Sequence, residues 1–470
     1  MTASSPSWQR LHPASLAVNF IPTAWRTLRS AWPVLLALLI GGENVGLQAA
    51  EMVVLLLFTG MTIINITVHW LTLRYRVTDA RLEIRSGLLH RQSRVLDAHR
   101  IQNLELVQNL FQKWAGLVEL KVETAGASST EGLLSAVSLS EASRVQRLLQ
   151  KATTAPGHDA PPPPILTTSA LELVAYGLSR RRLGAAALLT LVAVEVSGQL
   201  GPLAAQEVAN ALSPSVALAA FLLALAAAWV FSAAAALWKH FGFRLIREGD
   251  RLVTEEGLTT RRRIEIPVGK VQLLRSDEPM VRRAMGFSTL LIETAGLGIV
   301  EGQVRQSEGF VPMVERERLN ELSHHAVPQA DVDAWNVALN PAHPRALYRA
   351  CIRNLVRSVL AATIIGTMFH PWGWLSLLAI PLTLPLSWMD WRAQGWLVTP
   401  TTIVTRRGVL TRQTWVLARD KLQSIHLAQS PVMRWHGLGV LVVRVAGSQV
   451  ALPDVAFDQA QNLLRELAPS

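Results

Sequence analysis

The stretch RIQNLELVQNLFQKWAGLVELKVETAG, residues 100–126, decides the fold because the chain contains it three times. The second copy is KVQLLRSDEPMVRRAMGFSTLLIETAG at residues 270–296, and the third is KLQSIHLAQSPVMRWHGLGVLVVRVAG at residues 421–447. All three share a basic-aliphatic-Gln triplet, a base eleven residues after the Gln, a glycine fourteen residues after it and a closing Ala-Gly pair. Such internal repeats are read before other local signals. One module has therefore been triplicated.

The repeat also extends upstream of this stretch. Gly87, Gly257 and Gly408 each precede an arginine by four places, and that arginine lies eleven places before the Gln. A glycine between short segments of alternating apolar and polar residues is typical of a turn between strands. Val118 and Leu120 alternate with charged residues in the same way, as in a half-buried strand. We therefore expect each module to consist mainly of strands.

Each module ends in apolar residues at helical spacing. The pattern covers residues 142–149 in the first copy, 314–322 in the second and 456–467 in the third. Several strands closed by one helix predict a small, partly open β-barrel that the helix caps.

Apolar residues make up half of the 470-residue chain and are concentrated in paired segments. A membrane helix needs roughly 20 mostly apolar residues. We therefore predict six spans in three hairpins: 31–49 with 52–72, 184–203 with 214–238, and 355–370 with 373–391. The first apolar run follows a polar segment without a small-residue cleavage site, so we expect it to remain as an anchor.

The expected fold class is thus a set of membrane α-helical hairpins, each followed by an α+β module. The predicted domains are an N-terminal segment with hairpin 1 (1–73), module 1 (74–155), a Pro-rich linker with hairpin 2 (156–241), module 2 (242–326), a linker with hairpin 3 (327–394) and module 3 (395–470).

The distribution of charge predicts the orientation. Hairpins return the chain to its starting side, so all modules share one face, and nearly all Lys and Arg lie on it. The positive-inside rule makes that face cytoplasmic and the protein a multi-pass inner-membrane protein. The lone Cys351 excludes an intrachain disulfide. Tryptophans near the predicted span ends are expected to lie at the headgroup level: Trp70, Trp238, Trp372, Trp374, Trp388, Trp391 and Trp396.

The stretches 102–126, 272–296 and 423–447 resemble the bacterial pleckstrin-homology-like (PH-like) membrane proteins of the YdbS and YdbT type. The motif RLHP at residues 10–13 and the related NPAHP at residues 340–344 add to the resemblance. Three modules make the YdbT kind the nearer of the two. The resemblance implies PH-like modules, a smaller YdbS-like membrane protein as partner or self-assembly, and a role in envelope stress or tolerance of membrane-active peptides.

Nine repeated bases are candidates for contact with membrane lipids or a partner: Arg91, Arg261, Arg412, Arg100, Lys270, Lys421, Lys113, Arg283 and Arg434. In one interpretation they meet lipid phosphates, at about 1 kcal/mol per charge. In the other, which we favour for the arginines and lysines around each triplet, charges protect strand edges from edge-to-edge pairing. The repeated amides and glycines are expected to be structural: Gln102, Gln272, Gln423, Gly116, Gly286 and Gly437.

The function that these patterns favour is a non-enzymatic scaffold whose modules serve protein assembly or contact with the inner leaflet. The alternative is a transporter or permease-like subunit, because Glu195 is an ionisable residue inside a predicted span. No nucleotide loop, metalloprotease motif or cysteine pair suggests a cofactor, a metal or a catalytic residue. The net charge of +11 is not accompanied by a nucleic-acid-binding motif, so no nucleic acid is expected as a partner.

Overall fold

The computed structural model describes residues 8–16, 60–61, 63–64, 67–68, 70–78, 81–88, 91–124, 132–151, 162–179, 214–294, 299–300, 303–304, 309–328, 332–368 and 370–467. The predicted spans 31–49 and 184–203, most of the span 52–72, and Glu195 lie outside the described residues. The chain divides into two compact units, which are 1–161 with 259–265 and 298–304, and 162–258 with 266–297 and 305–470.

The first unit contains the first module and some strands from the sequence of the second. Its elements are β1 (Gln9–Arg10), β2 (Arg74–Thr78), β3 (Arg81–Ser86), β4 (Gln92–Asp97), η1 (Ala98–Arg100), β5 (Ile101–Gln108), α3 (Leu110–Trp114), β6 (Leu117–Thr124), β7 (Gly132–Ser138), α4 (Leu139–Lys151), most of β11 (Arg261–Pro267), β14 (Ile299–Val300) and β15 (Gln303–Val304).

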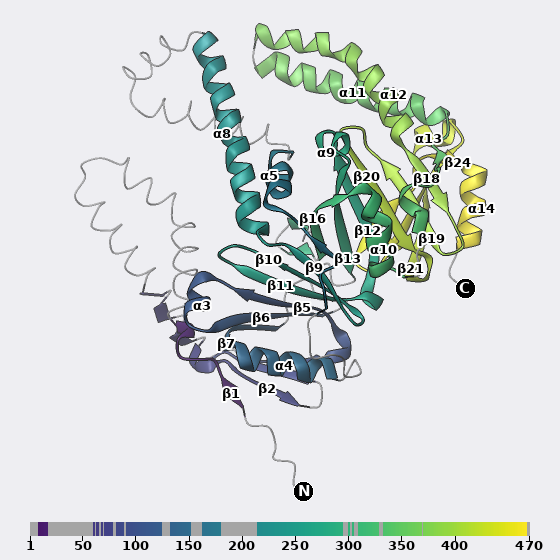
Figure 1. Ribbon diagram of the computed structural model, residues 1–470. Coiled ribbons are helices and arrows are strands. Elements are labelled where there is room, and N and C mark those ends of the chain that lie inside the picture. Colours follow the sequence, from purple (N-terminus) through teal and green to yellow (C-terminus); the bar gives the residue numbers. More distant parts are fainter. Residues whose placement is uncertain are drawn as a thin grey trace. The chain divides into compact units, whose positions relative to one another are not determined.

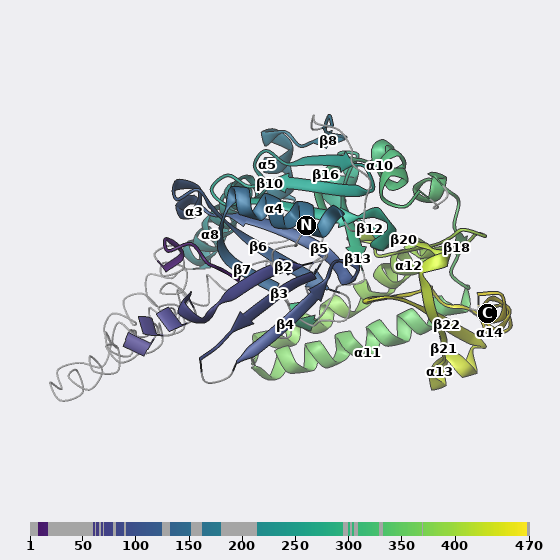
Figure 2. The ribbon, with the colours of Figure 1, turned by 90° about the horizontal axis from the view of Figure 1, so that it is seen from below.

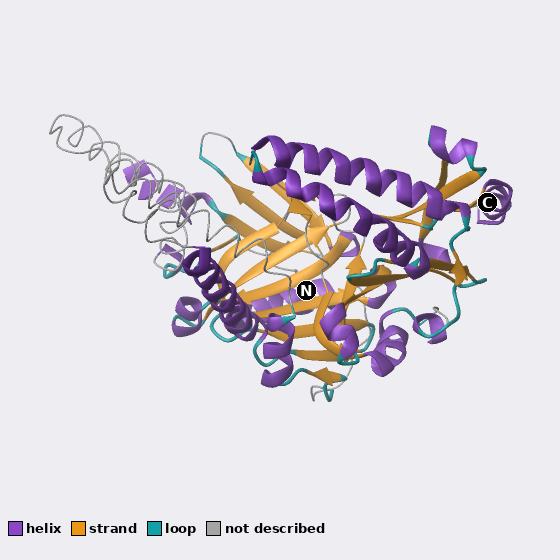
Figure 3. Ribbon diagram, turned by 90° about the horizontal axis from the view of Figure 1, so that it is seen from above, coloured by secondary structure: helices purple, strands orange, loops and turns teal. Residues whose placement is uncertain are grey.

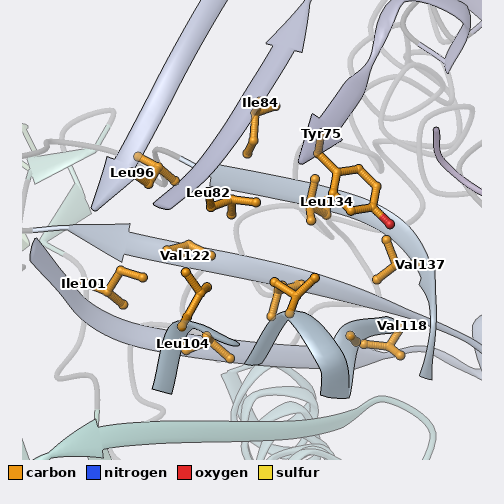
Figure 4. Close-up of a cluster of buried hydrophobic side chains, with 14 of the residues drawn as sticks. Tyr75, Leu82, Ile84, Leu96, Ile101, Leu104, Val118, Val122, Leu134 and Val137 are labelled. Carbon is orange, nitrogen blue, oxygen red and sulfur yellow. The ribbon is translucent and has the colours of Figure 1, made fainter. Parts of the chain in front are cut away.

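An apolar core lies between two antiparallel sheets of this module. One sheet has the order β1-β2-β3-β4, and β5, β6 and β7 are neighbours in the other (Figure 2). Leu82 and Leu96 from the first sheet face Val122 and Leu134 from the second, and α4 adds Val145 (Figure 4). Fully burying such a side chain contributes about 1.5–3 kcal/mol. The predicted strand-rich module with a C-terminal helix is confirmed.

The second unit repeats this pattern twice and carries the apolar helices. Its elements are β8 (Leu166–Thr167), α5 (Ala170–Leu178), α8 (Pro214–His240), β9 (Arg244–Glu248), β10 (Arg251–Glu256), η2 (Val268–Lys270), β12 (Val271–Pro279), α9 (Met280–Ala284), β13 (Phe287–Thr294), β16 (Gly309–Glu315), η3 (Arg316–Arg318), α10 (Leu319–Ala326), η4 (Val332–Trp335), β17 (Asn340–Pro341), α11 (Arg345–Met368), η5 (Trp372–Leu382), α12 (Thr383–Ala393), β18 (Gly395–Val398), β19 (Thr402–Arg407), β20 (Thr411–Ala418), η6 (Arg419–Lys421), β21 (Leu422–Ala428), α13 (Pro431–Trp435), β22 (Leu438–Val445), β23 (Ser448–Ala451), β24 (Val455–Ala456) and α14 (Phe457–Leu467).

Sheets continue from one module's sequence into the next, which the sequence analysis did not predict. Within the first unit, β11 pairs with β5 and places Arg261 opposite Gln108. Within the second unit, β20 pairs with β12 and places Arg412 opposite Glu278 (Figure 1). These two pairs occupy equivalent repeat positions, so both junctions use the same antiparallel register.

A two-residue strand before each predicted hairpin pairs with the first strand after it. The pairs are β1 with β2, β8 with β9, and β17 with β18. The two ends of each intervening segment are therefore neighbours. The RLHP and NPAHP motifs lie at β1 and β17, where the Nδ1 atoms of His12 and His343 each accept a backbone N–H at 3.2 Å from the residue two places on.

Two described helices are long and apolar enough to cross a membrane, over Leu222–His240 in α8 and Arg345–Thr367 in α11. Only 17% of each apolar window is buried, so neither helix is the core of a soluble domain. After α11 the chain turns back through η5 and α12, which run beside it (Figures 1 and 3). Because α11 begins at Arg345, the predicted start at residue 355 was ten residues late. Two of the six predicted spans thus correspond to candidate membrane helices in the described residues, and the arrangement of three hairpins stays a prediction.

Two other sequence interpretations were wrong. Val314 belongs to strand β16, and the closing helix of the second module begins at Leu319. Trp396 is 5% exposed in the core of the third module, and Trp70 packs against the core of the first, so neither is a headgroup anchor. The reason is that Trp396 lies within β18, and Trp70 lies shortly before β2, so both residues belong to the start of a module.

Candidate membrane-facing surface

Each module carries a one-turn helix between two long strands, and we call these three helices, α3, α9 and α13, the tip helices. The Asn109 side chain accepts the Gln112 N–H at 2.8 Å and so caps α3, while the Ser430 hydroxyl caps α13 through the Met433 N–H. Each tip helix is followed by one of the repeated glycines, and Gly437 has φ +64°, a conformation that favours glycine. The motif glycines therefore end the tip helices.

Large apolar side chains on the tip helices point to solvent. Trp114 is 76% exposed and Trp435, its equivalent in the third module, is 92% exposed. The other exposed apolar residues at the tips are Leu110, Phe111, Met280, Val281, Met285 and Val432. Soluble proteins rarely gather such side chains without a partner, and repetition at equivalent positions makes chance exposure a poor explanation.

The tip helix of the third module lies against the start of apolar helix α11. An Arg345 Nη1–H donates to the His436 carbonyl at 3.3 Å, and Tyr348 stacks on the His436 ring. Arg349 forms a two-pronged ion pair with Asp454, with N–O distances of 2.7 and 2.6 Å, and also approaches the Met433 sulfur. These contacts therefore hold the tip helix of the third module against the first turns of α11.

The tip helix of the second module is tied to α8 through α5. The Arg282 guanidinium lies 4.8 Å from the centre of the Tyr176 ring in α5. The Ser232 hydroxyl of α8 donates to the Gly177 carbonyl of α5 at 2.7 Å. A Cβ atom on Gly177 would lie 2.5 Å from the Ala233 Cα, so the two helices touch backbone to backbone.

In the first unit, α3 lies beside the segment that leads into the first predicted hairpin. The Gln112 side chain donates to the Ser135 carbonyl, and the His12 N–H donates to the carbonyl of the next residue, Ala136, at 3.4 Å. Ala14 packs against Leu117, which starts the strand after α3. The tips of the second and third modules thus lie near the module-side ends of α8 and α11, and the tip of the first lies near residues 12–14, which precede the first predicted hairpin.

The nine predicted bases fall into three environments. Lys113, Arg283 and Arg434 lie on the tip helices, where Lys113 and Arg434 are exposed and an Arg283 Nη1–H donates to the Val409 carbonyl at 3.3 Å. Each tip helix therefore carries one of these bases among its exposed apolar side chains.

The bases that precede the triplets lie at the strand junctions. Arg91 is exposed before β4, Arg261 begins β11, and Arg412 in β20 pairs with Glu278 at 3.4 Å. Burial lowers the pKa of Arg412, Glu278 opposes this, and nearby Arg316 adds to the lowering. Because β20 lies between β19 and β12, Arg412 does not protect a free edge, and that interpretation was wrong for it.

The bases of the triplets lie in short turns. Arg100, Lys270 and Lys421 end η1, η2 and η6. Burial, followed by repulsion from Arg251, lowers the pKa of Lys270, and the Lys421 ammonium donates to the Gly269 carbonyl at 3.2 Å. The Lys421 ammonium therefore connects η6 to the turn at η2.

The motif glutamines differ between copies. The Gln272 amide donates to the Lys270 carbonyl at 3.2 Å and is buried, whereas Gln423 is exposed. Gln102 lies in β5, at the position equivalent to Gln272. Within the described part of the chain, no group of three or more His, Cys, Asp or Glu could hold a metal ion.

The exposed tip tryptophans were not predicted from the sequence, although the repeat contains a pattern that could have indicated them. Trp114 and Trp435 occupy the same repeat position, each one residue after a predicted base. The five-residue helices are too short for a periodicity test, which needs a window of 11–18 residues.

Repeated strand-rich modules that alternate with apolar helices define a class of membrane protein with several copies of one module. The family model described as "Bacterial PH domain" matches residues 33–153, 187–327 and 355–470, so the chain belongs to this family. It is also 23% identical, over 97% of both chains, to the UPF0699 transmembrane protein YdbT of Bacillus subtilis. No solved structure matches the chain.

Proposed function

We propose that the protein is a non-enzymatic membrane scaffold whose PH-like modules are held against the inner leaflet by their tip helices. The observation that carries this proposal is the exposure of Trp114 and Trp435 beside bases, at the points where apolar segments leave the modules. Indole rings favour the headgroup level of a bilayer, and a base there gains about 1 kcal/mol from anionic lipid. Three anchored tips would fix the orientation of each module relative to the bilayer.

The remaining module surfaces would then be free for protein assembly. The two strand junctions support this, because they use a module's strand edge as a docking surface within one chain. A smaller YdbS-like membrane protein with the same kind of module, or another copy of this chain, is the expected partner. A role in envelope stress, or in tolerance of membrane-active peptides, is proposed from the resemblance, and a deletion strain's sensitivity to such peptides would test it.

The lipid contact can be tested with a fluorescent probe at a tip. In a Cys351→Ser background, Trp435→Cys is labelled with an environment-sensitive nitrobenzoxadiazole dye, and the full chain is reconstituted into phosphatidylethanolamine–phosphatidylglycerol vesicles. We expect blue-shifted emission that nitroxide-labelled lipids quench. The matched control is Gln423→Cys, which is exposed near the opposite end of β21, roughly 17 Å from the last residue of that strand at about 3.3 Å per residue.

The control should emit as in water and resist quenching. Equal quenching at both positions would mean that the whole module is embedded. No quenching at position 435 would show that the tip meets something other than lipid, and the proposal of leaflet contact would be abandoned.

A further inference from the structure

The two strand junctions are made by equivalent strands in the same register. Each joins a strand of the β5 type to a strand of the β4 type from the module that follows in sequence. Near the same end of both junctions, Leu104 lies opposite Glu265 in one, and Leu274 lies opposite Val416 in the other. All four side chains are buried, with exposed fractions of 2%, 1%, 0% and 1%.

Three modules provide three strands of each type, and the junctions use two of each. In the described part of the chain, β4 of the first module is the terminal strand of its sheet, and β21 of the third module is the terminal strand of its own. In the described residues, one strand of the β4 type and one strand of the β5 type therefore lie at the edge of a sheet.

The side chains on these terminal strands are more exposed than their equivalents in the junctions. Val95 of β4 is 57% exposed, whereas its equivalents Glu265 and Val416 are each 1% exposed. Ile425 of β21 is partly exposed, whereas its equivalents Leu104 and Leu274 are buried. Both strands thus expose apolar side chains at the positions that a junction would cover.

The closing helix adds to this pattern. In the first unit, the Gln146 amide of α4 donates to the Glu265 carboxylate, so the helix of the preceding module contacts the docked strand at the Leu104–Glu265 end of the junction. The corresponding helix in the third module is α14, which lies in the same module as β21. A strand that pairs with β21 could therefore contact α14 as β11 contacts α4.

We infer that β21 of one copy pairs with β4 of a second copy, in the register of the two junctions within the chain. Equivalent positions place Val95 opposite Ile425 and Gln92 opposite Ala428. No pair in this register sets two permanent like charges opposite each other across Gln92–Leu96. A second copy is the occupant that the structure favours, because each chain carries one edge of each type. An exposed edge is also a template for pairing.

The interface is heterologous, so repeated use gives a ring or a filament. This inference deepens the assembly role in the proposed scaffold and rests on it. It does not depend on the tip helices. The strand pairing can therefore be disproved while the lipid contact is confirmed, and the lipid contact can be disproved while the strand pairing is confirmed.

The test uses two differently tagged, full-length chains, each in a Cys351→Ser background. One carries Gln92→Cys and the other Ala428→Cys, both at exposed positions. They are co-expressed, and isolated membranes are oxidised with copper phenanthroline. We expect a disulfide-linked heterodimer that carries both tags, because residues opposite each other on antiparallel strands lie about 4.5–5.5 Å apart, within disulfide reach. A link inside one chain cannot produce this species.

The matched control replaces Gln92→Cys with Ser93→Cys, whose exposed side chain points to the other face of β4. Its cross-linked fraction should be at least fivefold lower. Adding Val95→Asp to the Gln92→Cys chain should cut cross-linking by a similar factor, because the charge would lie against Ile425. Val95 is exposed, so the variant should still fold, and proteolysis confirms this.

Equal cross-linking by the Gln92→Cys and Ser93→Cys chains would indicate random collision and overturn the inference. Absence of the heterodimer from folded, membrane-inserted chains would overturn it too. If the smaller YdbS-like protein occupied β21 instead, co-expression of the two tagged chains alone would again give no heterodimer, with the tip probe at position 435 still quenched.

Discussion

At the scale of single residues, Asp454 joins the third module to its apolar helix. Its side chain is 3% exposed, and it accepts two N–H groups from Arg349 of α11. Removing one partner of a buried pair leaves the other charge uncompensated, at a cost of about 3 kcal/mol. We therefore expect Asp454→Ala to lower the free energy of unfolding of this module by roughly that amount, measured by urea-dependent proteolysis in detergent.

The matched control is Glu466→Ala, which removes an ion pair with Arg419 in the same module. Glu466 is 58% exposed in this pair, so the change should cost less than about 1 kcal/mol. If both variants unfold at the same urea concentration, the Arg349–Asp454 pair does not stabilise the contact between the third module and α11.

Gly177 tests the close contact between α5 and α8. A methyl group there would meet the backbone of Ala233 and the Ser232 carbonyl at 2.5–2.7 Å. Overpacking of this kind costs about 1–3 kcal/mol, because backbone must move. We expect Gly177→Ala to lower the thermal midpoint in detergent, whereas Gly269→Ala, where nothing lies within 4 Å of the new Cβ, should leave it unchanged. Equal midpoints would show that α5 and α8 are not packed this closely.

At the scale of elements, Glu105 of β5 secures the docked strand β11. It accepts from the Arg262 guanidinium at 2.8 and 2.5 Å and is largely buried. A hydrogen bond to a charged group contributes about 1.5–3 kcal/mol, which corresponds to roughly tenfold to hundredfold in an opening equilibrium. Glu105→Ala should therefore speed amide exchange in residues 261–265 by about that factor, measured by hydrogen–deuterium exchange mass spectrometry.

Glu119→Ala is the control for this prediction. Glu119 and Glu105 both pair with Lys121, at 3.6 and 3.8 Å, and Glu105 also accepts from the Arg262 guanidinium of β11. Exchange in residues 261–265 should stay at its original rate in that variant. Faster exchange in both would attribute the effect to Lys121 and not to the Arg262–Glu105 pair.

The strands and turns could be predicted from sequence because their signals are local and occur three times. Gly87, Gly257 and Gly408 mark the same turn, and the apolar alternation of residues 117–124 became β6. The partner of each edge strand could not be predicted, because Arg412 opposite Glu278 is a contact over more than a hundred residues. Charges at a strand edge look the same in sequence whether they prevent pairing or, as here, pair with a carboxylate across it.

At the scale of the whole molecule, the short strand pairs bear on sidedness. Because β1–β2, β8–β9 and β17–β18 each join the two ends of a predicted hairpin, every intervening segment must return to the side it left. An even number of crossings per segment would put all three modules on one side. By the positive-inside rule, the excess of Lys and Arg in the modules predicts that this side is the cytoplasmic one.

This arrangement can be tested with one exposed position on the closing helix of each module: Arg147, His324 and Asn462. Each is changed to Cys in a Cys351→Ser background and exposed to a membrane-impermeant maleimide. We expect all three to react in inverted vesicles and none in right-side-out vesicles, because each closing helix lies on the soluble part of its module. Reaction of all three only in right-side-out vesicles would place the modules on the other side of the membrane. It would still agree with an even number of crossings in each segment. Reaction of position 324 from the opposite side to the other two would mean that the middle segment crosses an odd number of times, which the β8–β9 pairing does not allow.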